Sequence, residues 1–410
     1  MTGCSGISAS EPLNEPLKMA KPPASDFLGR LQSELDSLAA ASQLRRLAVV
    51  EGINLCSNDY LDLAHDPRLK KALADALAGG CAVGSTGSRL LSGNAKIWEQ
   101  LEGELAQFAG AEAALFFNSG YAANVGLFSC IAGPQDVIFS DEANHASIID
   151  GVRLSRARKV IFPHLDLDFL ERELRHCESG LAQKFIATES VFSMDGDRAP
   201  LAELAAIAER YGAELIVDEA HATGVFGAGG RGLAARSGAA RAPLATIHPC
   251  GKAFAAMGAF VCCSETLKQY LVNRARTFIF STALPPYVAA QLRATVGIVA
   301  GADSERSRLA SLHAFLRGKL RDAGFETGRS DSQIVPVLLG SNERTVQFAD
   351  ALSQAGFAVR AIRPPTVPAG TSRLRLSLTA AMQLPMLQRL VGEMISIREQ
   401  LSASLCSTGL

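Results

Sequence analysis

The segment LIVDEAHATG (215–224) ends an apolar run with an acid and places a histidine three residues later. A buried carboxylate is costly unless it is paired. Asp218 is therefore expected to face a cation or a hydrogen-bond donor, for which a protonated pyridine nitrogen is one candidate. A structural acid that caps the following turn is the alternative. Asp218 and His221 could also begin a metal site, but the sequence offers no third ligand.

A lysine stands among apolar residues in the segment IHPCGKAF (247–254). An apolar environment lowers the pKa of a lysine and allows it to form a Schiff base with a carbonyl compound. A surface lysine whose stem packs on apolar neighbours is the ordinary interpretation. Because Lys252 follows the next apolar run after the one that ends at Asp218, a chemical role is favoured.

Two glycine-containing segments could bind a phosphate group. In LFFNSGYAAN an apolar run leads through Asn-Ser-Gly into a helix, and free N–H groups at a helix N-terminus attract anions. Gly120 and Tyr121 lie at this turn, which could also be an ordinary strand-to-helix connection. The second segment, VGSTGSRLLSG (83–93), has neither the GxGxxG spacing nor the GxxxxGK[ST] spacing of known phosphate loops.

Three further segments contain polar residues that could face a ligand. His145 follows an apolar run in DEANHASIIDG, where a helix cap or a core histidine is the alternative. Ser193 in TESVFSMDGD could donate to an anion or belong only to a turn. Arg373 and Arg375 lie on one face of a predicted strand, and an arginine can hold a carboxylate with two hydrogen bonds. Solvent-facing strand arginines are the alternative there.

Short apolar runs alternate with amphipathic helical patterns from about 95 to 295 and must position these side chains. The runs begin near residues 113, 136, 159, 184, 214, 246 and 258. Such alternation predicts an α/β fold with a mostly parallel, doubly wound sheet, which binds ligands beyond the carboxyl ends of its strands. Helices are also expected over 26–47 and 67–78.

After Pro285 and Pro286 the pattern changes to a long helical segment that extends to about residue 322. Mixed strand and helix patterns follow, which predict a smaller α+β domain. We therefore expect an N-terminal tail and helical segment over 1–57, a large domain over 58–296 and a small C-terminal domain over 297–410.

The composition of the 410-residue chain narrows the classes of function. A formal net charge of -1 gives no sign of binding to nucleic acid or to an anionic membrane. No apolar run reaches about 18 residues and the first 25 residues lack a secretory pattern, so a transmembrane helix and secretion are not expected. Nine cysteines without a CxxC pair predict reduced thiols in a cytoplasmic protein rather than a zinc site.

Taken together and in this order, the segments resemble the α-oxoamine synthases, a family of fold-type I enzymes that use pyridoxal 5'-phosphate (PLP). The shared markers cover nearly the whole chain and are SNDYL, GSTGSRLLSG, NSGYAAN, HASIIDG, ESVFSMDGD, VDEAHATG, GKAF and FSTALPP. Each marker alone is weak, but their joint occurrence is very specific. The resemblance implies a PLP cofactor and a decarboxylative condensation of an amino acid with an acyl thioester. It also implies a homodimer whose subunits share active sites.

The resemblance assigns cofactor contacts to individual residues. Lys252 would carry PLP as a Schiff base and act as the base at the amino-acid α-carbon. Asp218 would hold the pyridine nitrogen protonated, His221 would bond the phenolic oxygen, and His145 would stack on the ring. The further cofactor contacts that it implies are Gly120, Tyr121, Ser193 and, from the other subunit, Ser281 and Thr282.

Substrate contacts are implied in the same way. Arg375 would hold the amino-acid carboxylate, and Asn58, Thr366 and Arg45 are further candidates. The segment 361–381 resembles the branch of the family that condenses L-alanine with pimeloyl-CoA, or with a pimeloyl carrier-protein thioester, in biotin biosynthesis. The alternatives are another amino acid or acyl chain, such as serine with a long-chain acyl group, a catalytically silent partner subunit, and a nucleotide-binding α/β protein.

One departure from the family pattern concerns the phosphate site. The residue three positions before the lysine is commonly Thr or Ser in this family, whereas this chain has Pro249. Proline has neither a hydroxyl nor an N–H group to offer to a phosphate. The neighbouring His248 is a candidate to compensate for it.

Overall fold

The computed structural model describes residues 26–177, 183–236 and 242–407, so the expected N-terminal tail lies outside the described residues. The chain forms two compact units, one that ends at Leu47 and one that begins at Ala48. Helix α1 (Phe27–Ala40) belongs to the first unit. The helix predicted over 26–47 is therefore present, but it ends earlier than the apolar pattern indicated.

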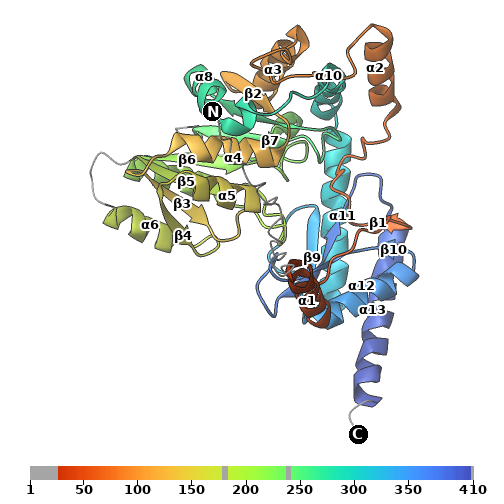
Figure 1. The fold of residues 1–410 in the computed structure, drawn as a ribbon. Coiled ribbons are helices and arrows are strands. Elements are labelled where there is room, and N and C mark those ends of the chain that lie inside the picture. The colour runs from red at the N-terminus through yellow and green to blue at the C-terminus, as the bar shows by residue number, and fades with distance from the viewer. Residues whose placement is uncertain (1–25, 178–182, 237–241, 408–410) are drawn as a thin grey trace, which may run out of the picture. The chain divides into compact units, whose positions relative to one another are not determined.

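A seven-stranded sheet forms the centre of the second unit (Figure 1). Its spatial order is β2-β8-β7-β6-β5-β3-β4. The strands are β2 (Ala113–Phe117), β3 (Val137–Asp141), β4 (Arg158–Phe162), β5 (Lys184–Glu189), β6 (Ala213–Asp218), β7 (Ala245–Pro249) and β8 (Ala259–Cys263). Only β8 runs opposite to the other six strands, so the predicted mostly parallel sheet is confirmed, with a strand at each predicted apolar run.

Helices cover both faces of this sheet, as a doubly wound fold requires. On one face Leu127 and Ile148 pack against strand residues such as Ile216, and on the other face Leu204 packs against Leu215. The first face carries α4 (Gly120–Ile131), α5 (Ala146–Leu154), α8 (Glu265–Arg274) and α9 (Arg276–Ile279), and the second carries α6 (Leu167–His176) and α7 (Leu201–Tyr211). The inner strands are therefore buried along their length, whereas the edge strand β4 is largely exposed.

A third core cluster continues from the large sheet into the C-terminal part of the chain. It includes side chains of α2 (Pro67–Ala78), α3 (Lys96–Ala109), α10 (Pro286–Ala300), α11 (Asp303–Asp322), α12 (Asn342–Gln354) and α13 (Leu384–Ser407). A three-stranded sheet of order β11-β12-β9 (Ala361–Ile362, Ser372–Ser377 and Ile334–Gly340) packs there, and β1 (Ile53–Asn54) pairs with β10 (Phe357–Ala358). The α+β pattern predicted for this region is present. The predicted domain boundaries at 57/58 and 296/297 stay predictions, and α10 spans the second one.

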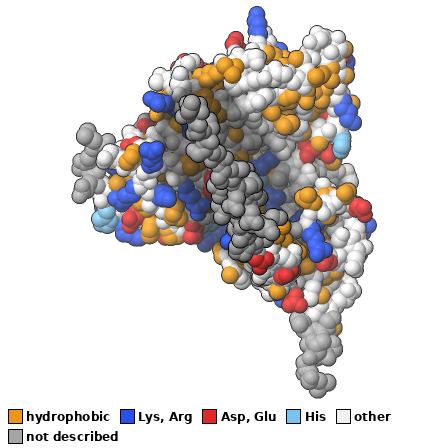
Figure 2. All heavy atoms as spheres, viewed as in Figure 1, with side chains coloured by type: hydrophobic (Ala, Val, Ile, Leu, Met, Phe, Trp, Pro, Cys, Tyr) orange, Lys and Arg blue, Asp and Glu red, His pale blue; other side chains and the backbone are white. Residues whose placement is uncertain are grey.

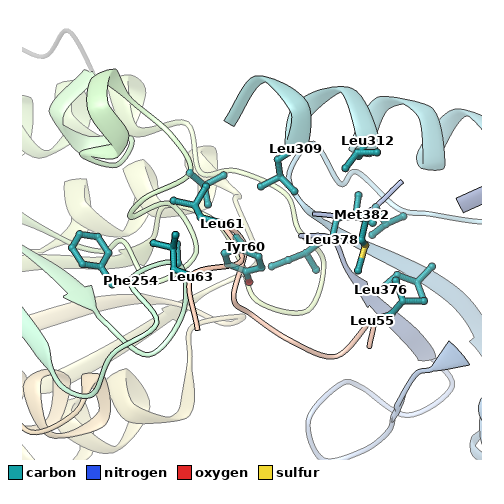
Figure 3. Close-up of a cluster of buried hydrophobic side chains, with 14 of the residues drawn as sticks. Leu55, Tyr60, Leu61, Leu63, Phe254, Leu309, Leu312, Leu376, Leu378 and Met382 are labelled. Atoms are coloured by element: carbon teal, nitrogen blue, oxygen red, sulfur yellow. The ribbon is translucent and has the colours of Figure 1, made fainter. Parts of the chain in front are cut away.

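The segment that follows β1 links the large sheet to the C-terminal sheet. Figure 3 shows Tyr60 and Leu61 between Phe254 on one side and Leu378 on the other. The backbone N–H of Ala380 donates to the Tyr60 carbonyl at 2.8 Å. The side chains of this segment are therefore held firmly between the two sheets.

The surface and the cysteines agree with the composition. Acidic and basic side chains both occur over the face shown in Figure 2. In the part of the chain that the structure describes, no helix is long and apolar enough to cross a membrane. The seven cysteines whose side chains the structure describes are free thiols, and Cys250, Cys262 and Cys263 are buried.

Candidate active site

The carboxyl ends of three neighbouring strands bring charged side chains together. Glu189 ends β5 and pairs in register with Asp218, which ends β6, while Lys252 follows the end of β7. A cavity of about 230 Å³ opens at this edge of the sheet. Its walls are formed by Gly120, Tyr121, Asn124, His145, Ser147, Glu189, Asp218, Ala220, His221, Pro249 and Lys252. The structure thus brings together six of the predicted site residues.

The Lys252 side chain lines the cavity without a hydrogen-bond partner among the described residues. Among residues 26–177, 183–236 and 242–407, its ammonium group makes no hydrogen bond and no ion pair within 4.0 Å. Burial lowers the pKa of Lys252 to about 8, against the opposing effect of Asp218 and Glu189. A lysine with a pKa near neutrality is available as a nucleophile and as a base. Lys252 is half-buried in the cavity wall, and its chemical role stays a prediction.

Asp218 is buried and hydrogen-bonded, yet it retains lone pairs. Its Oδ2 accepts from Asn124 Nδ2 at 2.7 Å, and its Oδ1 accepts from the backbone N–H of Ala220 at 2.9 Å. Only 3% of Asp218 is exposed. The carboxylate caps the turn after β6, as one alternative expected, and it also lines the cavity, where it can accept from a cationic N–H group.

His221 belongs to a buried network that continues into the C-terminal sheet. Its Nδ1 lies 2.6 Å from the Tyr60 hydroxyl, and that hydroxyl lies 3.0 Å from Asn58 Oδ1. Both terminal nitrogens of Arg375 donate to the same Asn58 oxygen at 3.1 Å, and Arg375 Nε donates to the Ser193 carbonyl. Burial and the positive charge of Lys252 hold the pKa of His221 well below its usual value.

The arginines predicted on one strand face are both buried. Arg373 and Arg375 are 5% and 9% exposed, so the solvent-facing alternative is excluded. Arg373 forms an ion pair with Asp195, whereas Arg375 faces Asn58 and Tyr60. Only Arg375 is therefore connected to the cavity through hydrogen bonds.

His145 begins helix α5 and lines the open part of the cavity. Its backbone N–H donates to Glu189 Oε1 at 2.6 Å, and its Nδ1 accepts from the Ser147 N–H at 3.2 Å. Burial, followed by the Asp218 charge, raises the pKa of Glu189 to about 8. The ring of His145 approaches Tyr121 edge to face at 6.4 Å between centroids. His145 thus caps a helix, as one alternative expected, and also faces the cavity.

The N-terminus of α4 closes one end of the cavity against Pro249. A Cβ on Gly120 would lie 2.7 Å from Pro249 Cγ, so only glycine allows this approach. His248 does not reach the cavity, because side chains alternate along a strand and its ring points to the other face. There it bonds Thr223 and Thr246, and burial lowers its pKa to about 3. The expectation that His248 compensates for Pro249 is therefore not supported.

Other predicted residues lie outside the cavity wall. The Asn118 side chain donates to the Thr282 carbonyl at 2.6 Å, and Ser281 and Thr282 run beside the glycine-containing segment through a bridge between Thr282 and Ser88. Thr366 is exposed in the loop before β12, and Arg45 belongs to the first compact unit. Ser193 contributes its carbonyl to Arg375. The roles assigned to these residues stay predictions.

Four residues that the sequence analysis did not assign belong to the site. Asn124, Ser147 and Glu189 line the cavity, and Tyr60 joins His221 to Arg375. Each lies inside a marker segment, within a few residues of a predicted contact. The available signal was helical spacing, because Asn124 lies one turn after Gly120 and therefore on the same face of α4.

A mostly parallel doubly wound sheet with an unpaired lysine beyond its strand ends defines a candidate PLP site of the fold-type I class. The sequence profile of the family "Aminotransferase class I and II" matches residues 50–394. The 8-amino-7-oxononanoate synthase of Geobacter sulfurreducens is 47% identical over 88% of this chain and 93% of the relative. That of Burkholderia thailandensis is 46% identical over 84% and 89%. This chain therefore belongs to the aminotransferase class I and II family and, within it, to the group of 8-amino-7-oxononanoate synthases.

Solved structures support the same fold. The serine palmitoyltransferase of Sphingomonas wittichii superposes with a TM-score of 0.85 at 30% identity, over 93% of this chain and 100% of that one. The 8-amino-7-oxononanoate synthase of Francisella tularensis gives 0.73 at 31% identity, over 86% and 99%. A serine palmitoyltransferase from S. paucimobilis, solved with bound PLP, gives 0.84 at 30%, over 92% and 100%. The predicted fold-type I architecture is thereby confirmed.

Proposed function

We propose that this protein uses PLP to condense L-alanine with a pimeloyl thioester, releasing CO2 and the thiol and forming 8-amino-7-oxononanoate. The observation that carries the proposal is the unpaired Lys252 beside Asp218, in a chain 47% identical to a named 8-amino-7-oxononanoate synthase. PLP supplies an electron sink for the carbanion formed at the amino-acid α-carbon. Pimeloyl-CoA and a pimeloyl carrier protein are both suitable thioesters.

The residues of the cavity fit this cofactor. Lys252 has no competing partner, and both oxygens of Asp218 keep a lone pair that can accept from a protonated ring nitrogen. The N-terminus of α4 offers backbone N–H groups to a phosphate, and Gly120 lets this helix end pack closely against Pro249. His145 would face the ring, and His221 would bond its phenolic oxygen.

The protein side chains then have distinct tasks. Lys252, with a pKa of about 8, can remove and return the proton at the α-carbon close to neutral pH. Arg375 would bind the amino-acid carboxylate, because Asn58 and Tyr60 hold its guanidinium toward the cavity. Tyr121, Ser193, Thr366 and Arg45 remain proposed contacts of cofactor or substrate.

We also propose a homodimer located in the cytoplasm. Val83, Leu91 and Phe280 are 78%, 82% and 70% exposed, and their segments meet at the bridge between Ser88 and Thr282. Exposed apolar side chains of this size favour a subunit interface. Ser281 and Thr282 would then contribute to the phosphate site of the second subunit. Free thiols at all described cysteines are in keeping with a reducing compartment.

A second candidate function is favoured by one observation. The superposition on serine palmitoyltransferase has a TM-score of 0.85, against 0.73 for the solved 8-amino-7-oxononanoate synthase. Serine with a long-chain acyl thioester is therefore the alternative substrate pair. Sequence identity of 47% with the Geobacter sulfurreducens synthase favours L-alanine and a pimeloyl thioester as the substrate pair.

The test is a spectrum followed by a substrate comparison. The purified protein with PLP should show a visible band that L-alanine alters, and Lys252→Ala should lose the lysine-dependent band. Turnover should be faster with L-alanine and pimeloyl-CoA than with L-serine and palmitoyl-CoA. Absence of the band in the wild type would reject the PLP proposal. A preference for serine and palmitoyl-CoA would reject only the substrate assignment.

A further inference from the structure

Asn124 is a buried cavity residue with no role in the reaction proposed above. It is 1% exposed, and its Nδ2 lies 2.7 Å from Asp218 Oδ2 and 2.9 Å from Ser147 Oγ. Its Oδ1 is buried without a partner. An unpaired buried acceptor carries a free-energy penalty. We take this penalty as a sign that the site requires the two N–H groups of this amide.

The orientation of the amide is fixed by its neighbour. An ionised Asp218 can only accept, so the NH2 group of Asn124 must face it, since the reversed amide would bring two acceptors together. Asp218 Oδ1 accepts from the Ala220 N–H at 2.9 Å. Each oxygen of the Asp218 carboxylate therefore accepts from one neutral donor.

Ser147 connects the Asn124 amide to the imidazole of His145. The Ser147 N–H can only donate, and it lies 3.2 Å from His145 Nδ1. The Ser147 Oγ accepts from Asn124 and has its own hydrogen for the same Nδ1, at 2.7 Å. His145 Nδ1 is therefore an acceptor, and a neutral imidazole must carry its proton on Nε2.

The state and direction of the His145 ring agree with this assignment. Burial lowers the pKa of His145, with Asp218 opposing and Lys252 adding to the effect, so the ring is neutral near pH 7. Its Nε2 makes no hydrogen bond within the described ranges, and the ring lines the cavity. An Nε2–H group is therefore free to donate to a ligand.

Close packing of α4 on α5 holds this geometry. A Cβ on Gly151 would lie 2.9 Å from the Asn124 carbonyl oxygen and 2.9 Å from Phe128 Cβ. Glycine therefore lets the two helices approach until Ser147 reaches Asn124. The segments NSGYAAN and HASIIDG thus contribute one element each to the same hydrogen-bond chain.

We propose that Asn124 and Ser147 form a positioning relay that sets the protons on two sides of the cavity. Asn124 holds the Asp218 carboxylate toward the cofactor ring by donating to its Oδ2, and Ser147 holds His145 as an Nε2–H donor toward the bound amino acid. Both are positioning residues, because they act through Asp218 and His145. The identity of the ligands rests on the proposed function, whereas the proton arrangement does not.

Asn144 offers a matched control for the first test. It is also a buried asparagine with an unpartnered Oδ1, and its Nδ2 donates to Ser140 Oγ and the Ala187 carbonyl, away from the cavity. PLP dissociation constants should be measured by absorbance titration of apoprotein, with thermal unfolding of each variant. Asn124→Ala should weaken PLP binding at least tenfold, because it removes a donor to a charged group. Asn144→Ala should stay within twofold of the wild type.

The second measurement requires no variant for its main result. Protein labelled with ¹⁵N-histidine reports the tautomer of each imidazole, and the signal of His145 is assigned by its loss in His145→Gln. The wild type should show the Nε2–H form, and Ser147→Ala, which keeps only the backbone N–H as a donor to Nδ1, should show a larger share of the Nδ1–H form. This measurement uses the apoprotein, so its result does not depend on whether the protein binds PLP.

Each outcome decides the inference. An Nδ1–H form of His145 in the wild type would overturn the relay. Unchanged PLP affinity in Asn124→Ala, or an equal loss in Asn144→Ala, would reduce Asn124 to a structural residue. Absence of PLP binding by the wild type would instead reject the proposed function and leave the histidine measurement to judge the relay.

Discussion

Two clusters in this molecule contain the same kinds of ionisable group, two carboxyl groups and one base. They differ in whether the base is hydrogen-bonded to the carboxyl groups. The cavity cluster consists of Glu189, Asp218 and Lys252, which line one cavity without a direct ion pair. Burial lowers the pKa of Lys252 to about 8 and raises that of Glu189 to about 8. Because the three side chains form no ion pair with one another, they remain available to a ligand.

The second cluster, called the His164 cluster, consists of His164, Asp141 and Asp197. The two ring nitrogens lie 2.9 Å from Asp141 Oδ1 and 2.9 Å from Asp197 Oδ2. Burial alone would lower the pKa of His164, but the hydrogen bonds to both carboxylates outweigh it and raise it to about 10. The comparison shows that contact geometry, and not residue composition, distinguishes a ligand site from a structural clamp. Here a clamp means a cluster, such as the His164 cluster, whose base is hydrogen-bonded to both carboxylates.

The largest expected effect comes from removing the base of the cavity cluster. Lys252→Ala should lower kcat by about 10³-fold or more, because it removes the cofactor attachment and the α-carbon base. Stability of the apoprotein should not fall, since Lys252 has no partner to leave unpaired. Steady-state kinetics and urea unfolding measure the two quantities. A clear loss of apoprotein stability would place Lys252 in the same category as His164.

The second-largest effect is expected when one carboxylate in each cluster is replaced by an amide. Asp218→Asn should lower kcat by about 10²-fold to 10³-fold, because the charge that faces the cofactor ring is lost. Asp141→Asn removes an equivalent charge beside His164 and should change kcat less than about threefold while lowering the unfolding midpoint. Both variants keep the side-chain shape. If Asp141→Asn lost activity as strongly as Asp218→Asn, the distinction between the clusters would fail.

The fold was predictable because the strands are buried on both faces and read as short apolar runs between helices. Each of the seven runs forms a strand of the sheet. The break between α10 and α11 was not expected in the long helical pattern, because both segments continue the same spacing across Gly301. Boundaries of this kind depend on tertiary packing, which a single sequence does not encode locally.

The site was predictable where a residue carries its own local signal. Asp218 ends an apolar strand, and Lys252 stands in an apolar segment. Tyr60 carries no such signal, because its partner His221 lies 161 positions away and only the packing between two sheets joins them. His248 was a misleading candidate, although strand alternation alone already placed it on the face opposite Pro249.

Removal of the base of the His164 cluster should lower the free energy of unfolding of the protein, because it leaves two carboxylates unpaired. His164→Ala should cost about 2–3 kcal/mol, less than a fully buried pair, because 24% of the His164 side chain is exposed. The pKa of His164 is raised from 6.5 to about 10, so its contribution is complete below pH 6.5 and is lost as pH rises toward 10. Urea unfolding from pH 6 to pH 10 should show a larger decline in the wild type than in His164→Ala, which still contains Glu189. An identical pH dependence in both proteins would contradict the clamp.

Glu189 gives the smallest and most discriminating prediction, because its replacement should stabilise the protein, whereas replacement of His164 should destabilise it. Its pKa is raised from 4.5 to about 8, so the folded chain keeps a proton that the unfolded chain releases, and stability falls as pH rises from 4.5 to 8. Glu189→Gln abolishes that titration and still offers Oε1 to the His145 N–H. The variant should therefore be about 1 kcal/mol more stable than the wild-type apoprotein at pH 8 and nearly unchanged at pH 5. Destabilisation of equal size at both pH values would mean that Glu189 is a paired structural acid, and the contrast between the two clusters would no longer hold.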